Sequence, residues 1–442
     1  MIFGWMNQFA QSKRSQIIFF AAYVVLTSLG LYFIQDSVIA FLLLLFSILI
    51  LYYLKLSNKA KWIMGFLILA ILVPLSASHG SAYQSYMEVG TLVGIYAAMS
   101  LGLNIVVGFA GLLDLGFIAF FAVGAYTYGI FASAQASKFM PFGHYPLPGD
   151  TFWLFIIAGA LIASIFGILL GIPVLRVRGD YLAIVTLGFG EIIRIVLNNM
   201  DHPINITNGS MGISSITPPD FFGISIGNSS QFYYIVLAIF MVVMYIVTKL
   251  EDSKLGRAWK AVRDNEIAAQ AMGIPLVRTK LAAFAIGASF SGMMGTVFAA
   301  KQMFVDATSF TYLESTMILV MVILGGMGSV PGVILGAAVV TILNTQVLTE
   351  ISNWLNQLST TGAIAIPDAL SPAKMQRLIF GILLIVFALY RSQGLIPHKN
   401  KKVNAEELKK AASEGSSSPE AGSPSPETAL VNESRTTGGV DL

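Results

Sequence analysis

The sequence predicts an all-α fold, a polytopic integral membrane protein whose helical bundle holds about 10–12 membrane segments. Of the 442 residues, 56% are hydrophobic and only 11% are charged, whereas a typical soluble domain carries about 25% charged residues. Many apolar runs reach the roughly 20 residues that a helix needs to cross a bilayer. Lysine and arginine gather in the short connections between these runs, which is typical of cytoplasmic loops.

Residues 1–87 are expected to add transmembrane helices ahead of the main bundle. Lys13 and Arg14 indicate a cytoplasmic N-terminus, and three lysines between 55 and 61 indicate that the chain returns to that side. The predicted spans in this region are 16–34, 38–54 and 62–78.

Residues 88–398 are expected to form the core of the bundle. Two glycine-rich breaks, 108–116 (GFAGLLDLG) and 325–332 (GGMGSVPG), interrupt its apolar runs. Each break joins either two full spans or two half-helices, because irregular backbone within a membrane needs protein or water around it. The connections 200–230 and 349–376 are predicted outside the cell. The predicted spans are 88–109, 117–134, 151–175, 181–199, 231–248, 281–300, 313–324, 333–348 and 377–391.

The C-terminal segment 399–442 has a different composition. Serine, proline, glycine and glutamate dominate it, and it has too few apolar residues to form a core. The sequence therefore predicts a disordered cytoplasmic tail.

The loop 249–280 is the most basic connection of the chain, with seven of the 26 lysine and arginine residues. Its first part has helical periodicity, with an apolar face and a charged face. The apolar face consists of Leu255, Trp259 and Val262, and the charged face of Arg257, Lys260 and Arg263. A folded platform of this kind suits docking of a soluble subunit, whereas an unfolded basic loop only fixes topology.

A second short helix is predicted in the same loop. Asn265 is expected to cap its start, and Glu266 suits the positive end of its dipole. Gly273, followed by Pro275, is expected to end it.

Ionisable residues within or beside the apolar runs are candidates for a solute path. Such residues are costly in a membrane and often mark a path or a paired structural site. Glu191 and Arg194 are three residues apart and share a helix face, so they either neutralise each other or border the path of a zwitterion. Asp114 is either a helix cap or a path residue. The complete set of path candidates is Asp114, Thr186, Glu191, Arg194 and Glu314.

Several kinds of chemistry find no support in the sequence. There is no phosphate-binding loop of the G-x-x-x-x-G-K-[ST] type and no nucleophile motif. The four histidines lie far apart, and there is no cysteine, so neither a metal site nor a cofactor is expected. The net charge of +3 gives no indication of nucleic-acid binding.

Seven segments together resemble the LivM-type permease of bacterial branched-chain amino acid ABC importers. The resemblance covers roughly 88–397 and is specific, because long motifs match in the same order. The segments are GLNIVVGFAGLLDLGFIAFFAVGAYTY (102–128), PVLRVRGDYLAIVTLGFGEIIRIVLNN (173–199), TNGSMGI (207–213), GRAWKAVRDNEIAAQAMGI (256–274), KLAAFAIGASFSGMMGTVFAAKQ (280–302), ILGGMGSVPGVILGA (323–337) and YRSQGLIP (390–397).

The resemblance implies an ABC importer permease fold in the bacterial inner membrane, surrounded by lipid. It implies a second, LivH-like permease subunit, two ATP-binding subunits that hydrolyse ATP, and an extracytoplasmic solute-binding protein. Glu266, Ala268, Ala269 and Gly273 match the docking loop of importer permeases, although Ile267 interrupts the usual E-A-A order. With Arg257, Trp259 and Arg263 they form the expected ATPase-docking set.

The expected function is therefore uptake of branched-chain or other neutral and hydrophobic amino acids by alternating access. One alternative is a related permease for urea or short amides, because fold-level analogy does not fix the substrate. Another is an ion-coupled secondary transporter, which would have no use for a folded docking loop.

Overall fold

The computed structural model divides the chain into two compact units, Met1–His398 and Lys399–Leu442. The structure describes residues 13–33, 58–78, 83–140, 142–175, 177, 179–221 and 223–350, with isolated positions in 43–51, 352–353 and 378–396. The predicted tail at 399–442 lies outside the described residues. So do most of the predicted spans 38–54 and 377–391 and most of the connection 349–376.

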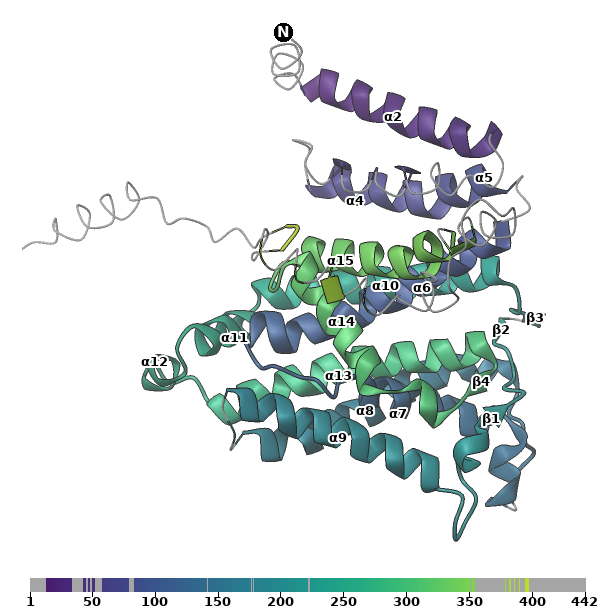
Figure 1. Ribbon diagram of the computed structural model, residues 1–442, viewed down its shortest axis with the longest axis vertical. Helices are drawn as coiled ribbons and strands as arrows, with labels where there is room; N and C mark the ends of the chain where they lie inside the picture. The colour runs from purple at the N-terminus through teal and green to yellow at the C-terminus, as the bar shows by residue number, and fades with distance from the viewer. Residues whose placement is uncertain are drawn as a thin grey trace, which may run out of the picture. The chain divides into compact units, whose positions relative to one another are not determined.

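The described residues are mostly helical and contain only short strands, which confirms the all-α class (Figure 1). Within the part of the chain that the structure describes, seven helices are long and apolar enough to cross a membrane, and three shorter apolar helices accompany them. The helices are α2 (Lys13–Phe33), α4 (Asn58–Leu67), α5 (Val73–Ala77), α6 (Tyr83–Asn104), α7 (Ile118–Phe131), α8 (Phe152–Val174), α9 (Asp180–Asn199), α10 (Ser229–Asp252), α11 (Lys254–Asp264), α12 (Glu266–Ala271), α13 (Leu276–Gln302), α14 (Tyr312–Gly325) and α15 (Val330–Ile342). Single π-helical turns follow α4, α6 and α15 at Ile68–Leu72, Ile105–Phe109 and Leu343–Val347.

Small residues allow α13 to pack closely against α7 and α8 in the centre of the bundle. A Cβ added to Gly124 on α7 would overlap the Gly292 carbonyl on α13, and a Cβ on Gly292 would overlap Ala163 on α8. Thr296 Oγ1 also donates a hydrogen bond of 3.1 Å to the Gly124 carbonyl. At these contacts the three helix backbones approach so closely that a larger side chain than glycine would overlap. Small residues commonly allow such close packing between membrane helices.

The helices α7 and α14 are both 14 residues long and begin beside one another. The Ile118 amide at the start of α7 donates to Ser315 Oγ in the first turn of α14, at 2.9 Å. Phe117, just before α7, packs against Gly102 in α6. Gly102 precedes the π-helical turn Ile105–Phe109, so the chain has turned back along α6 by residue 117. The first glycine-rich break therefore carries the chain back into the bundle, where the shorter α7 begins.

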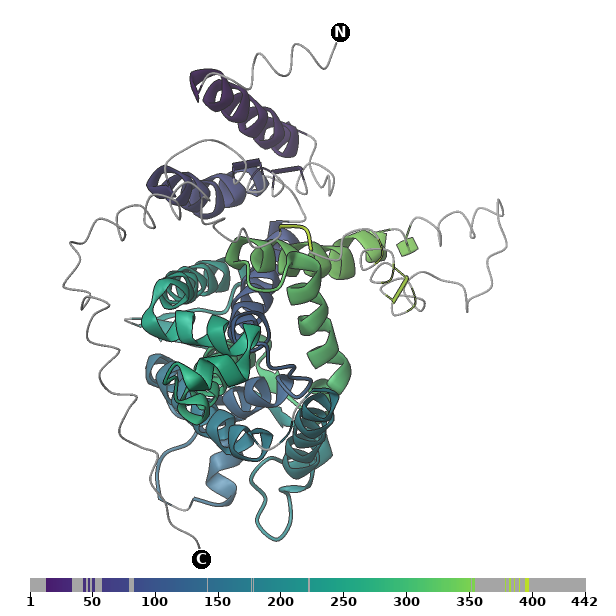
Figure 2. The same cartoon turned by 90° about the vertical axis from the view of Figure 1, so that its left-hand side faces the viewer.

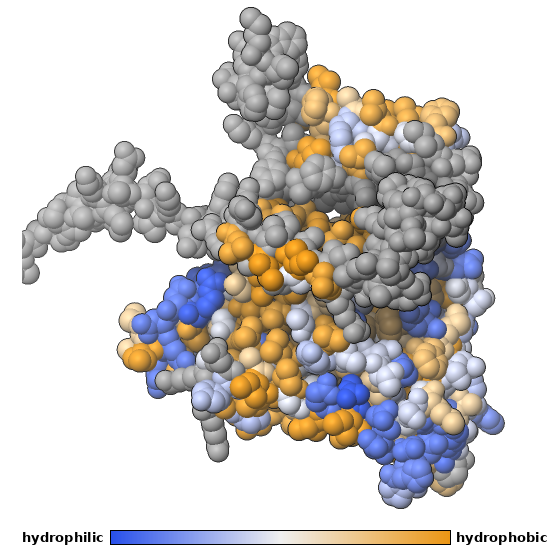
Figure 3. Space-filling view, viewed as in Figure 1, coloured by the Kyte–Doolittle hydropathy of each residue, from blue (hydrophilic) through white to orange (hydrophobic). Residues whose placement is uncertain are grey.

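The two ends of the bundle are polar and differ in structure. At one end, α11 and α12 project beyond the other helices (Figure 1), and this end faces the viewer in Figure 2. Hydrophilic residues gather there and at the opposite end, with apolar surface between them (Figure 3). On α8, Leu154, Leu161 and Ile165 are each more than half exposed, which suits contact with lipid.

The opposite end is covered by folded connections. β1 (Ile213–Ser214) pairs antiparallel with β4 (Phe304–Val305), and β2 (Asp220–Phe221) pairs with β3 (Ile224–Ser225). The Thr217 amide donates to the Ala132 carbonyl at 2.7 Å. The connection predicted at 200–230 is thus an ordered cap over the ends of α7 and α8.

The N-terminal helices pack on one another and on the bundle. A second apolar cluster joins residues of α2 and α5 to the start of α6 and to α10. Tyr233 Oη on α10 donates to the Leu69 carbonyl at 2.8 Å. The N-terminal helices therefore contact α6 and α10 directly.

Candidate functional site

The two helices predicted between α10 and α13 are present and form a folded platform, residues 253–275. Ser253 Oγ accepts from the Gly256 amide and caps α11, and Asn265 Oδ1 accepts from the Ala268 amide at 3.0 Å and caps α12. Gly273 has φ of +83° and ends α12, a conformation that side chains resist. The predicted cap at Asn265 and the predicted end of the second helix at Gly273 are confirmed, whereas the Ser253 cap was not predicted.

The platform is anchored to the bundle through its apolar face. Trp259 is fully buried, and its Nε1 donates to the Thr279 carbonyl on α13 at 2.8 Å. Lys260 pairs with Glu251 at 3.1 Å and lies over the ring of Phe109. A buried tryptophan with a satisfied N–H holds α11 rigidly against the end of the bundle.

An ion pair connects α12 to α13. Lys280 Nζ lies 2.8 Å from Glu266 Oε1, and the Lys280 side chain is only 7% exposed. Within α12, Ala269 is buried on the inner side, whereas Ala268 is exposed on the outer side. The short helix is therefore fixed on its inner side and free on its outer side.

The outer side of α12 carries two apolar residues that the sequence reasoning missed. Ile267 is 74% exposed and Met272 is 84% exposed. In the sequence Ile267 interrupts the docking motif, and its position on the solvent face of a capped helix is the signal that predicts its exposure. These two exposed apolar side chains are available for contact with another protein. Arg257 is also exposed, and it donates to the Asp252 carbonyl at 2.9 Å.

Arg263 differs from Arg257 on the predicted charged face. Its Nη1 donates to the Gly108 carbonyl in the first glycine-rich break. The same guanidinium approaches Gly328 in the second break. The side chain is therefore turned toward the bundle, with about a third of its surface exposed.

Among the path candidates, Asp114 and Thr186 are brought together. Thr186 Oγ1 accepts from the Leu115 amide at 3.0 Å, and a Cβ on Gly116 would overlap the Thr186 carbonyl. Asp114 is fully buried, and its Oδ1 accepts from the Gly116 amide at 2.8 Å. Its Oδ2 has no hydrogen-bond partner among the described residues.

Glu191 and Arg194 form the expected pair on α9. Arg194 Nε donates to Glu191 Oε2 at 2.8 Å, and each side chain is close to 30% exposed. Glu314 lies in the first turn of α14. Gly188, on the open side of α9, has no neighbouring atom within 4 Å of an added Cβ.

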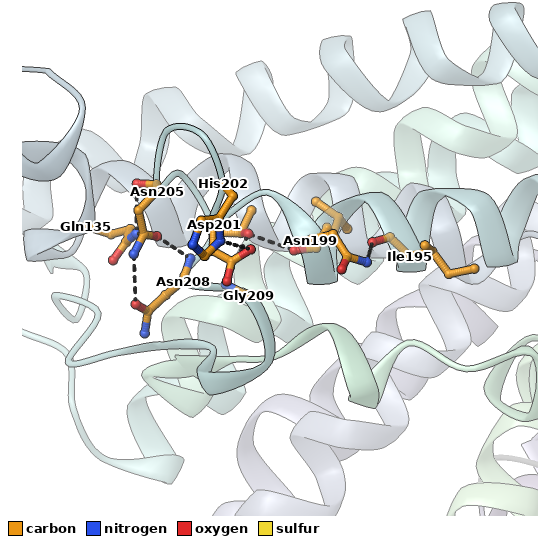
Figure 4. Close-up of polar contacts among 10 residues, drawn as sticks. Gln135, Ile195, Asn199, Asp201, His202, Asn205, Asn208 and Gly209 are labelled. Atoms are coloured by element: carbon orange, nitrogen blue, oxygen red, sulfur yellow. Dashed lines mark hydrogen bonds and ion pairs between the residues drawn. The ribbon is translucent and has the colours of Figure 1, made fainter.

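At the opposite end, a polar network holds the connection that follows α9 (Figure 4). Gln135 Nε2 donates to Asn205 Oδ1 at 2.6 Å. The Asn208 amide donates to the same oxygen at 2.9 Å, and Asn208 Nδ2 donates to the Gly212 carbonyl. These bonds give the connection a defined outer surface. In the part of the chain that the structure describes, no group of three or more histidine, aspartate or glutamate residues is placed to hold a metal ion.

Comparison with known proteins identifies related permeases. A family model described as the permease component of branched-chain amino acid transport systems matches residues 85–388. The high-affinity branched-chain amino acid transport system permease protein LivM of Escherichia coli is 36% identical over 381 residues, 81% of this chain and 79% of that protein.

Two further relatives have similar names. LivM of Salmonella typhimurium is 36% identical over 363 residues, 77% of this chain and 75% of that protein. A probable branched-chain amino acid transport permease protein LivM of Methanocaldococcus jannaschii is 27% identical over 329 residues, 69% of this chain and 91% of that protein. No solved structure gives a significant match.

Proposed function

Because the chain belongs to the permease component family of branched-chain amino acid transport systems, it is a transport subunit and not an enzyme, and we propose that it imports branched-chain or other neutral, hydrophobic amino acids. Transport proceeds by alternating access, and the ATP is hydrolysed on partner subunits.

The observation that carries this proposal is the platform. A topology signal needs only positive charge, whereas residues 253–275 form two capped helices held by the buried Trp259 and by the pair of Glu266 with Lys280. Ile267 and Met272 are presented outward on this rigid base. A rigid base with exposed apolar anchors is suited to receive a soluble subunit.

The proposed assembly contains this chain, a LivH-like second permease, two ATP-binding subunits and an extracytoplasmic solute-binding protein, in the bacterial inner membrane. Residues 88–398 form the permease core, 1–87 add helices, and 399–442 form a cytoplasmic tail. The platform faces the ATP-binding subunits, and the ordered connection over the opposite end faces the binding protein.

The solute path is proposed to follow α9 and the start of α7, past Asp114, Thr186, Glu191 and Arg194, with Glu314 at the start of α14. The pair of Glu191 with Arg194 retains exposed surface along an apolar helix. Lipid is a poor neighbour for such charges, so this face is proposed to border water between the two permease subunits.

Single cysteines test the path, because the chain contains no native cysteine. Gly188→Cys adds a side chain into open space on the proposed path face, and Ile165→Cys is its control on the apolar surface of α8. A water-soluble thiosulfonate should modify the Gly188→Cys variant and leave the Ile165→Cys variant unmodified. Equal reactivity of the two variants would remove the support for a path along α9.

The main test is purification of a tagged chain from native membranes, followed by reconstitution in vesicles. We expect two ATP-binding polypeptides to co-purify, and ATP to drive uptake of tritiated leucine. Met272→Asp should reduce co-purification, whereas Phe142→Asp, which changes an exposed residue at the opposite end, should not. Uptake driven by an ion gradient without ATP would instead support a secondary transporter.

The alternative substrates, urea and short amides, are tested in the same vesicles. Leucine uptake should persist in a large excess of urea or acetamide. ATP-driven uptake of radiolabelled urea or acetamide, with no leucine uptake, would move the chain to the urea and amide branch without changing its place in an ATP-driven importer.

A further inference from the structure

The two glycine-rich breaks, 108–116 and 325–332, touch each other at the platform end of the bundle. The Gly328 amide donates to Asn104 Oδ1 at 2.8 Å, across 224 residues of sequence. A Cβ on Gly108 would overlap Asn104 Oδ1 and lie 2.6 Å from the Gly328 nitrogen. Glycine at 108 is thus required by this approach of backbones.

A single platform side chain reaches both breaks. Arg263, in the last turn of α11, donates through Nη1 to the Gly108 carbonyl. A Cβ on Gly328 would lie 3.2 Å from the same Nη1, and a Cβ on Gly111 would meet the Arg263 stem. Arginine suits this position because its planar guanidinium presents several donors in a fixed geometry.

The second break is held from its other side as well. The Leu395 amide donates to the Leu324 carbonyl at 2.9 Å, and the Ile396 amide donates to the Gly325 carbonyl at 3.1 Å. Movement of α11 therefore acts on a connected set of backbone segments. We call Arg263, Asn104, Gly108 and Gly328 the junction.

We propose that Arg263 is a positioning residue that transmits displacement of the platform to both glycine-rich breaks at once. The first break leads into α7 and the second follows α14, the two half-length helices that meet inside the bundle. The junction thus connects the proposed ATPase-docking surface to the two helices that begin at the bundle interior. This inference rests on the proposed function, because it assumes an ATP-binding subunit on the platform.

The geometry separates transmission from docking. Docking is assigned to the outer side of α12, where Ile267 and Met272 are exposed. Arg263 faces the bundle and makes its hydrogen bond on the inner side. Loss of Arg263 should therefore leave the ATP-binding subunits attached but weaken the link between ATP hydrolysis and transport.

The experiment uses the complex purified from native membranes and reconstituted in vesicles, with Arg263→Gln as the test and Lys254→Gln as the matched control. Lys254 lies on the same helix, but it is exposed. For Arg263→Gln we expect normal subunit stoichiometry, basal ATP hydrolysis within about twofold, and leucine uptake reduced at least about tenfold. The loss of one charge-assisted hydrogen bond of about 1.4 kcal/mol changes an equilibrium constant by a factor of ten.

A second measurement distinguishes transmission from simple support of the fold. Hydrogen exchange is followed in peptides covering 265–274 and 325–332, with and without ATP. In the wild type, addition of ATP should change the hydrogen-exchange rate in both peptides. In Arg263→Gln, and in the milder Arg263→Lys, the change at 265–274 should remain while that at 325–332 is lost.

Each other outcome contradicts the inference. Normal uptake by Arg263→Gln at equal membrane abundance would show that the junction transmits nothing. Loss of the ATP-binding subunits from both Arg263 variants would make Arg263 a docking anchor. If the wild-type chain itself carries no ATP-binding subunits, the proposed function fails, and this is visible before any variant is compared.

Discussion

Replacing Glu266 on α12 tests how the platform is held. Glu266 Oε1 lies 2.8 Å from Lys280 Nζ, with the lysine side chain 7% exposed and the glutamate 28% exposed. A charge-assisted hydrogen bond of this kind contributes about 1.5–3 kcal/mol. Glu266→Gln keeps an acceptor but removes the charge, so we expect local opening of α12 to become easier by about 2 kcal/mol.

This energy translates into a measurable rate. A change of about 2 kcal/mol corresponds to roughly 30-fold faster hydrogen exchange in the amides 268–274, if these exchange through local opening. Glu266→Lys should have a larger effect, because it places a second cation beside Lys280 and at the positive end of the α12 dipole. The bundle should remain folded, while the ATP-binding subunits co-purify poorly and uptake falls with them.

Two controls make the result decisive. Asp264→Asn changes a neighbouring carboxylate that is 74% exposed and 3.7 Å from Arg263, so its effect should stay below about 1 kcal/mol. The double variant Glu266→Lys with Lys280→Glu restores opposite charges and should recover part of the protection. Unchanged exchange in Glu266→Gln, or no recovery in the double variant, would refute the role assigned to this pair.

Three further predictions concern the anchor, the helix packing and the topology. Trp259→Ala should cost about 3–5 kcal/mol of local stability and abolish ATPase co-purification; normal co-purification would show that α11 needs no buried anchor. Gly124→Val should lower the thermal unfolding midpoint, because its side chain would overlap the Gly292 carbonyl and force α7 from α13 at about 1–3 kcal/mol or more; an unchanged midpoint would contradict this packing. In intact cells, an impermeant maleimide should label Ser210→Cys and not Gln270→Cys, and the reverse pattern would invert the topology.

The sequence alone predicted the elements that depend on neighbours within a few residues. Helical periodicity placed Trp259 on a buried face, Asn265 was recognised as a cap, and Gly273 as a helix end, and all three are confirmed. Caps and amphipathic faces are set by contacts three or four residues apart, so they can be read from a short stretch of chain. The resemblance to a permease family, carried by long ordered motifs, is confirmed by the family match.

The connections were less predictable. The sequence reasoning expected a polar stretch at 200–230 but not its two short strand pairs, one of which joins Ile213 to Val305. It left open how the glycine-rich breaks connect their helices. Each break is too short and too rich in glycine to carry a periodic signal, so its course depends on which backbones it contacts.

Tertiary structure alone decided the direction of Arg263 and the meeting of the breaks. The residue shares a charged helix face with Arg257 in sequence, yet its hydrogen-bond partner, Gly108, lies 155 residues away. Helical spacing places Arg257 and Arg263 on the same face, so it cannot show which of the two side chains contacts the bundle. What separates them is the packing of α11 on the bundle, which puts one guanidinium beside two glycine backbones and leaves the other in water.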